Sequence, residues 1–132
     1  MWDSVTPILT MLPRSSTNGV LAAPGSDWGK TFLELERYRT YKEGWDGQDA
    51  TGIPNDLIES AIALASVLRT RAVTPPCCVL PDFDGTVSFE WDTDDGAGAI
   101  SLNITEVGYA EFTVCRPGRD RVHLILTEAV AV

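Results

Sequence analysis

Two segments in the first half of the chain carry apolar residues at helical spacing. The first predicts a helix from about Asp27 to Lys42, since its large apolar side chains stand four, three and three residues apart and so share one face. Ser26 or Asp27 is the expected N-cap, because a short side-chain oxygen accepts hydrogen bonds from the free amides of the first turn. Gly44 is expected to close the helix in the left-handed conformation. The residues that share the face are Trp28, Phe32, Leu35 and Tyr38.

The second helix is predicted to start at Pro54 or Asn55, after a loop over residues 44–52. Proline suits the first helical position because its missing N–H has no helical partner there, and Asn55 is the other candidate cap. Cations near the end of the segment favour the helix dipole, and Pro75-Pro76 prevents continuation. The buried stripe is expected to consist of Ile58, Ala61, Ile62, Ala65 and Leu68.

From Cys77 onward the apolar residues recur with a period of two instead. In the clearest run, Val87, Phe89 and Trp91 alternate with polar residues, which is typical of a strand with one buried and one solvated face. Short connections rich in glycine, aspartate and proline favour antiparallel neighbours and hence a meander. The predicted strands cover residues 77–80, 86–92, 100–104, 110–115 and 122–126.

The order of these elements predicts the α+β class. The apolar face of the sheet must be covered by other elements, and the two helices are the only predicted elements that can cover it. We therefore expect two N-terminal helices packed on one face of a four- to five-stranded antiparallel meander, in a single domain over residues 27–132. Residues 1–26 lack periodicity and predict an irregular N-terminal arm. Trp2 and Ile8 are too apolar for a solvated tail, so part of the arm is expected to dock on the domain or on a partner.

Composition adds an acidic character to this domain. The chain has 132 residues, the size of one ordinary domain, and a net charge of −9. Such a surface repels nucleic acid and anionic lipids and attracts basic proteins, so no direct nucleic acid binding and no membrane contact are expected. The N-terminus lacks the basic region of a secretory signal, and no apolar run reaches membrane-spanning length. The three cysteines include the adjacent Cys77 and Cys78, which predicts reduced, partly buried thiols in a cytoplasmic protein.

The charge pattern is the most informative feature for function. Between Ala72 and Cys115 there is no lysine or arginine, whereas carboxylates are frequent. This pattern fits a solvated, solubilising face, or a surface complementary to a basic partner. The candidate partner-binding residues are Glu90, Asp92, Asp94, Asp95 and Glu111.

Other chemistry is weakly represented. The aspartates around residues 82–85 and 92–96 fit neither register of a calcium-binding loop, so no metal site is predicted. The only histidine, His123, is expected on the same polar sheet face as Cys115, which leaves open a cysteine–histidine nucleophile pair. The chain has no recognised catalytic or phosphate-binding motif, so it is predicted not to be an enzyme and to use no cofactor.

Residues 44–91 carry a further pattern. A Gly-Trp-Asp-Gly loop over 44–47 precedes a Pro-initiated helix, and Asp-Gly at 84–85 then leads to Glu-Trp at 90–91. This pattern resembles a family of small bacterial and phage-associated proteins of unknown function. The resemblance implies a shared fold and no particular activity. In physical terms, Trp45 is expected to anchor the loop on the core, and Asp46 to accept hydrogen bonds from loop amides.

Together these features predict a non-enzymatic, acidic protein-binding protein. It is expected to act as an inhibitor that occupies a basic surface of a partner, of an anti-CRISPR or other anti-defence type, or of an antitoxin or immunity type. One alternative is a structural or assembly module that self-associates into a homo-oligomer through its N-terminal arm. Another is a small hydrolase-like enzyme that uses Cys115 and His123.

Overall fold

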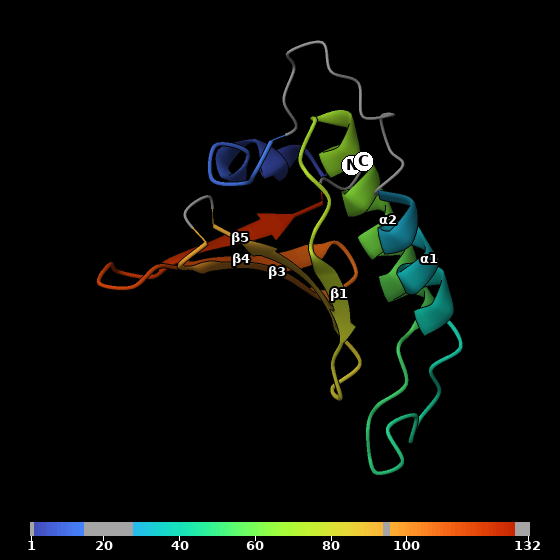
Figure 1. Ribbon diagram of the computed structural model, residues 1–132. Helices are drawn as coiled ribbons and strands as arrows, with labels where there is room; N and C mark the ends of the chain where they lie inside the picture. The colour runs from blue at the N-terminus through green and yellow to red at the C-terminus, as the bar shows by residue number, and fades with distance from the viewer. Residues whose placement is uncertain (1, 15–27, 94–95, 129–132) are drawn as a thin grey trace.

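The described residues of the chain fold into two α-helices, one short 3₁₀ helix and a five-stranded sheet (Figure 1). The computed structural model describes residues 2–14, 28–93 and 96–128. This arrangement confirms the predicted α+β class. The elements are η1 (Asp3–Ile8), α1 (Trp28–Tyr38), α2 (Asn55–Thr70), β1 (Cys78–Pro81), β2 (Val87–Asp92), β3 (Ala99–Glu106), β4 (Tyr109–Cys115) and β5 (Val122–Thr127).

The sheet is an antiparallel meander in the order β1-β2-β3-β4-β5, as the short connections predicted. Its register aligns the apolar positions across the strands: Phe89 faces Leu102, and Leu102 faces Phe112. Because side chains alternate along each strand, this alignment gathers the buried side chains on a single face. The predicted period of two is therefore the pattern that forms the core.

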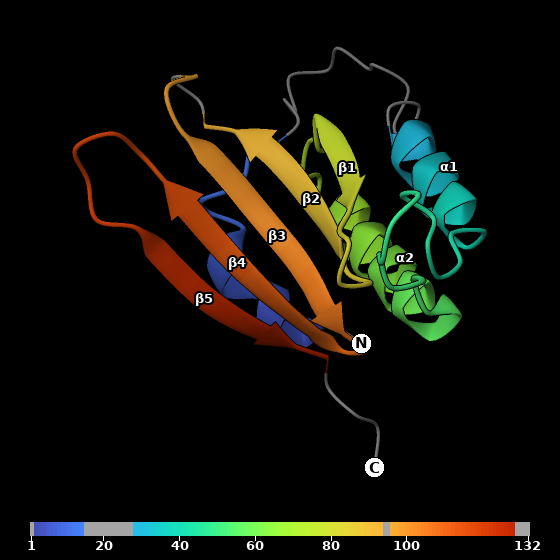
Figure 2. The ribbon, with the colours of Figure 1, turned by 90° about the horizontal axis from the view of Figure 1, so that it is seen from below.

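One face of this sheet is covered by three elements rather than two. Helix α2 packs on β3, and η1 packs on β5, while α1 lies beside α2 and contacts β1 (Figure 2). The expectation that the two α-helices alone cover the sheet is therefore wrong. The 3₁₀ helix covers the part of the sheet that α2 does not reach.

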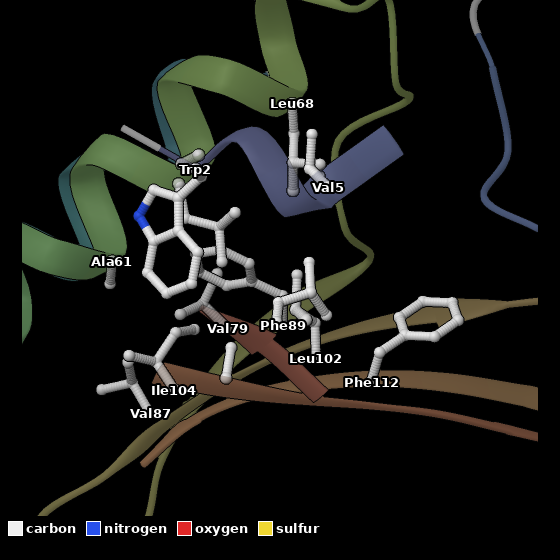
Figure 3. Close-up of a cluster of buried hydrophobic side chains, with 14 of the residues drawn as sticks. Trp2, Val5, Ala61, Leu68, Val79, Val87, Phe89, Leu102, Ile104 and Phe112 are labelled. Carbon is white, nitrogen blue, oxygen red and sulfur yellow. The ribbon is translucent and has the colours of Figure 1, made fainter. Parts of the chain in front are cut away.

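The first residues of the chain belong to the core. Trp2 is 1% exposed, and its ring lies between Ala61 of α2 and the strand residues Val87 and Ile104 (Figure 3). The indole Nε1 donates to the backbone oxygen of Ser60 at 3.2 Å. The segment predicted as an irregular arm thus contains a 3₁₀ helix and a buried anchor, and residues 1 and 15–26 of it lie outside the described part.

The helix ends differ in detail from the prediction. Helix α1 ends at Tyr38 instead of Lys42, and the next three residues form turns with hydrogen bonds between residues three apart. Helix α2 begins at Asn55, with Pro54 at the N-cap position and no side-chain cap. Asn55 is therefore not the cap, and the proposed caps of the first helix, Ser26 and Asp27, lie outside the described residues.

Replacing Trp2 by alanine is expected to lower the free energy of unfolding by about 3–5 kcal/mol, because the deletion leaves a cavity between α2 and the sheet. Urea denaturation measures the change. Phe83→Ala is the matched control, since Phe83 is 69% exposed and its loss should cost less than about 0.5 kcal/mol. Equal losses in the two variants would contradict this role of Trp2.

Candidate functional site

The face of the sheet that points away from the helices is uncovered in the part of the chain that the structure describes (Figure 2). Its side chains alternate with the buried ones and come from all five strands. We call this surface the open face. It includes Cys78, Leu80, Ser88, Glu90, Asp92, Ala99, Ser101, Asn103, Glu111, Thr113, Cys115, His123 and Ile125.

The predicted partner-binding carboxylates reach this face at two separate places. Glu90 and Asp92 stand two residues apart on β2, where Ser88 Oγ donates to Glu90 Oε2 at 2.6 Å. Glu111 lies two strands away on β4, a separation of roughly 10 Å from the usual strand spacing. Asp94 and Asp95 lie outside the described residues. The described members thus form an acidic pair on β2 and a separate carboxylate on β4.

Two nitrogen-bearing side chains lie near Glu111. His123 Nε2 lies 3.3 Å from Glu111 Oε1, and Arg121 borders the same shallow hollow of about 420 Å³. The Oδ1 atom of Asn103, which also lines this hollow, is buried and accepts no hydrogen bond. The long stretch without lysine or arginine is therefore not a cation-free surface. Pairing of β4 with β5 brings later residues beside it, and the alternation of β5 was the available signal.

The proposed nucleophile pair is not assembled. Cys115 and His123 point to the same side of the sheet, but no hydrogen bond joins them in the described residues. Cys115 borders a different hollow, beside Gly98 and Arg116. His123 is engaged with Glu111 instead, so the geometry supplies no base for the Cys115 thiol.

The two motifs of the 44–91 pattern meet in space. The backbone N–H of Thr51 donates to the oxygen of Phe83 at 2.7 Å, which joins the Gly-Trp-Asp-Gly loop to the β1–β2 turn. Gly85 in that turn has a φ of +87°, and a Cβ there would stand 3.0 Å from the backbone oxygen of Gly52. The close approach and the positive φ both require glycine at this position.

Trp45 and Asp46 hold this loop in different ways. Trp45 is half-buried, and its ring stacks on Tyr41 at 5.0 Å between centroids, while Nε1 donates to Thr51. Tyr41 packs in turn on the buried Tyr38, at 5.0 Å between ring centroids, so the loop is joined to the core through Tyr41. Asp46 Oδ1 accepts from the amides of residues 48 and 50, as in an Asx turn.

The β1–β2 turn exposes a large aromatic ring that the sequence analysis did not single out. Phe83 is 69% exposed and stands between Asp82 and Asp84. Both aspartates accept hydrogen bonds from nearby backbone amides, which fixes the turn. The signal was an apolar residue inside a polar turn, where burial is not expected.

The cysteines are exposed rather than partly buried, and no disulfide joins them. The Sγ atoms of Cys77 and Cys78 lie 3.9 Å apart. Partial desolvation, followed by the hydrogen bond with the Cys77 thiol, raises the pKa of Cys78 to about 11. Within the described ranges, no three side chains are grouped to hold a metal ion, and no helix has the length and apolarity to cross a membrane.

Comparison of the chain with protein-family models, curated proteins and solved structures finds no match. The resemblance of residues 44–91 to small bacterial and phage-associated proteins therefore stays a prediction.

The raised pKa of Cys78 predicts slow alkylation. At pH 8 its reaction with iodoacetamide should run about 100-fold slower in the folded protein than in the urea-unfolded chain, because the thiolate fraction is smaller. The rate in the folded protein should rise as the pH approaches 11. Peptide mapping by mass spectrometry measures it, and equal rates in both states at pH 8 would contradict the shift.

Proposed function

We propose that this chain is a non-enzymatic protein that binds a basic surface of a partner protein through the β2 side of its open face. The observation that supports the proposal is the acidic pair of Glu90 and Asp92. Neither residue forms an ion pair with another described residue, and no described element covers them. Unpaired carboxylates on an accessible sheet face attract cationic side chains of a partner.

The ion pairs elsewhere support the same choice of surface. Arg37 pairs with Glu34, and Arg39 pairs with both Glu36 and Glu59. These contacts neutralise carboxylates on the two helices. The net charge of −9 is therefore expressed mainly on the sheet and loops. Complementary charge of this kind mainly raises the association rate and selects the partner.

A protein that covers a basic surface competes with whatever that surface normally holds. Basic surfaces of this kind commonly hold nucleic acid, because phosphate neutralisation dominates such binding. The proposed class is therefore an inhibitor of a nucleic-acid-handling protein, of the anti-CRISPR or other anti-defence type, or an antitoxin or immunity protein directed at a basic toxin.

The two other functions receive less support from the geometry. Self-assembly through the N-terminal arm needs exposed apolar side chains, yet Trp2, Val5 and Ile8 are buried in their own chain. An enzyme built on Cys115 and His123 needs contact between them, which the sheet does not provide. The binding function depends on neither arrangement.

The proposal predicts the effect of a double charge reversal, Glu90→Lys with Asp92→Lys. Side-by-side affinity capture from lysate of the source organism should lose, in this variant, the partner that wild type releases at high salt. With the captured partner in hand, stopped-flow mixing at low salt should show an association rate lower by about tenfold or more, and a weaker dependence on salt.

The matched control is Glu43→Lys with Asp49→Lys, which changes the net charge equally at exposed positions away from the open face. This control should keep most of the association rate. Equal losses in the two variants would assign the effect to net charge alone. A loss in the control only would place the contact at the Gly-Trp-Asp-Gly loop, and either result contradicts the β2 site.

A further inference from the structure

The two edge strands of the sheet differ in how well they are protected against pairing with a further strand. An edge strand presents unpaired N–H and C=O groups that attract another strand, and proteins usually shorten, cover or interrupt such edges. Here β1 forms one edge and β5 the other. Only the first of them carries these protections.

The β1 edge is closed in three ways. The strand has four residues and ends in Pro81, which cannot donate to a further strand. Helix α1 lies against it (Figure 1). The hydroxyl of Tyr38 donates to the backbone oxygen of Val79 at 2.7 Å, which satisfies an acceptor on the outer side of the strand. No further strand can add here without displacing α1.

The β5 edge has none of these features. It has six residues, with no proline, lysine or bulge, and no described element lies beyond it (Figure 2). Three of its apolar residues remain partly open to solvent: Val122 and Leu124 at the margin of the core, and Ile125, 45% exposed, on the open face. A regular, apolar, uncovered edge of this length favours addition of another strand.

The backbone pattern shows which groups face outward. Glu128 N–H donates to the Gly108 oxygen, and in an antiparallel pair every second residue makes such bonds to its neighbour. Leu124 and Leu126 therefore bond to β4. The N–H and C=O groups of the intervening residues, His123 and Ile125, point away from the sheet.

We propose that a second copy of this chain pairs with β5 in antiparallel fashion, and that the two sheets join into one across a two-fold axis. With Leu124 at the axis, His123 stands opposite the partner's Ile125, and Val122 opposite the partner's Leu126. The pair of His123 and Ile125 lies on the open face of both sheets. The pair of Val122 and Leu126 lies on the buried face of both sheets. His123 and the partner's Ile125 exchange their outward hydrogen bonds, as a directly opposed antiparallel pair does.

Charge selects a second copy over the basic partner proposed above. Strands β2, β3 and β4 all carry carboxylates, whereas β5 carries none, and its neighbour Arg121 is a cation. A basic protein gains nothing from this edge. Within β5 itself, two copies of a chain of charge −9 meet without opposing carboxylates, and Asp120 stands opposite the partner's Glu128 only beyond the ends of the paired strands. The acidic pair on β2 remains free on both copies.

The test uses the full chain and no partner. Light scattering after size exclusion, at micromolar to millimolar concentrations, should give twice the monomer mass. Hydrogen exchange by NMR should show the amides of His123 and Ile125 protected to a degree that rises with concentration. Ile125→Pro removes an outward N–H and no bond to β4. It should raise the dimer dissociation constant by about 30-fold, because the two-fold axis doubles each lost hydrogen bond.

A second variant keeps the proposal testable if the Ile125→Pro protein does not fold. Ile125→Lys keeps the N–H and places a charge at the edge, and it should also favour the monomer. Its matched control is Leu33→Lys, at a 71% exposed site on α1, which should leave the dimer intact. A monomeric mass at every concentration would overturn the proposal. So would a dimer whose His123 and Ile125 amides exchange freely, or one that Ile125→Lys and Leu33→Lys weaken equally.

Discussion

Placement of the Trp2 ring between α2 and the sheet is the interaction on which the rest of the fold depends. The ring fills the space between Ala61 and the strands, and its Nε1 is held by the Ser60 oxygen. The hydroxyl of the same serine accepts from the Gly108 amide at the β3–β4 turn. One residue of α2 therefore fixes both the N-terminal segment and a sheet turn, and η1 follows Trp2 onto β5.

The described helices all pack on one face of the sheet. The open face and the β5 edge are therefore accessible to other molecules. The open face carries an acidic pair on β2 and a mixed-charge hollow between β4 and β5. The β1 edge is closed by α1 and by the Tyr38 hydroxyl. The two proposed interactions use different surfaces: the carboxylates of β2 for a basic protein, and the apolar β5 edge for a second copy.

The strands were predictable because alternation of apolar and polar residues directly reports a sheet with one buried face. The 3₁₀ helix was not, since a short helix containing Pro7 shows no 3.6-residue period. For the site, the alternation of residues correctly predicted that Glu90 and Asp92 lie on a polar face. The sequence analysis also assigned Glu111 to the same acidic surface, whereas it lies two strands away. The neighbours of Glu111 are His123 of β5 and Arg121 just before that strand, and a linear charge pattern does not show such pairing. The sequence did not identify Tyr41 as the ring on which Trp45 packs.

Burial of Trp2 against later parts of the sequence has a consequence for the chain while it is being translated. Trp2, Val5 and Ile8 are translated long before β5, the strand against which η1 packs. Contacts of such long sequence separation form slowly, and exposed apolar residues invite association meanwhile. Until α2, β2 and β3 have been translated, the Trp2 ring is exposed on the nascent chain, where a chaperone that recognises apolar segments can bind it.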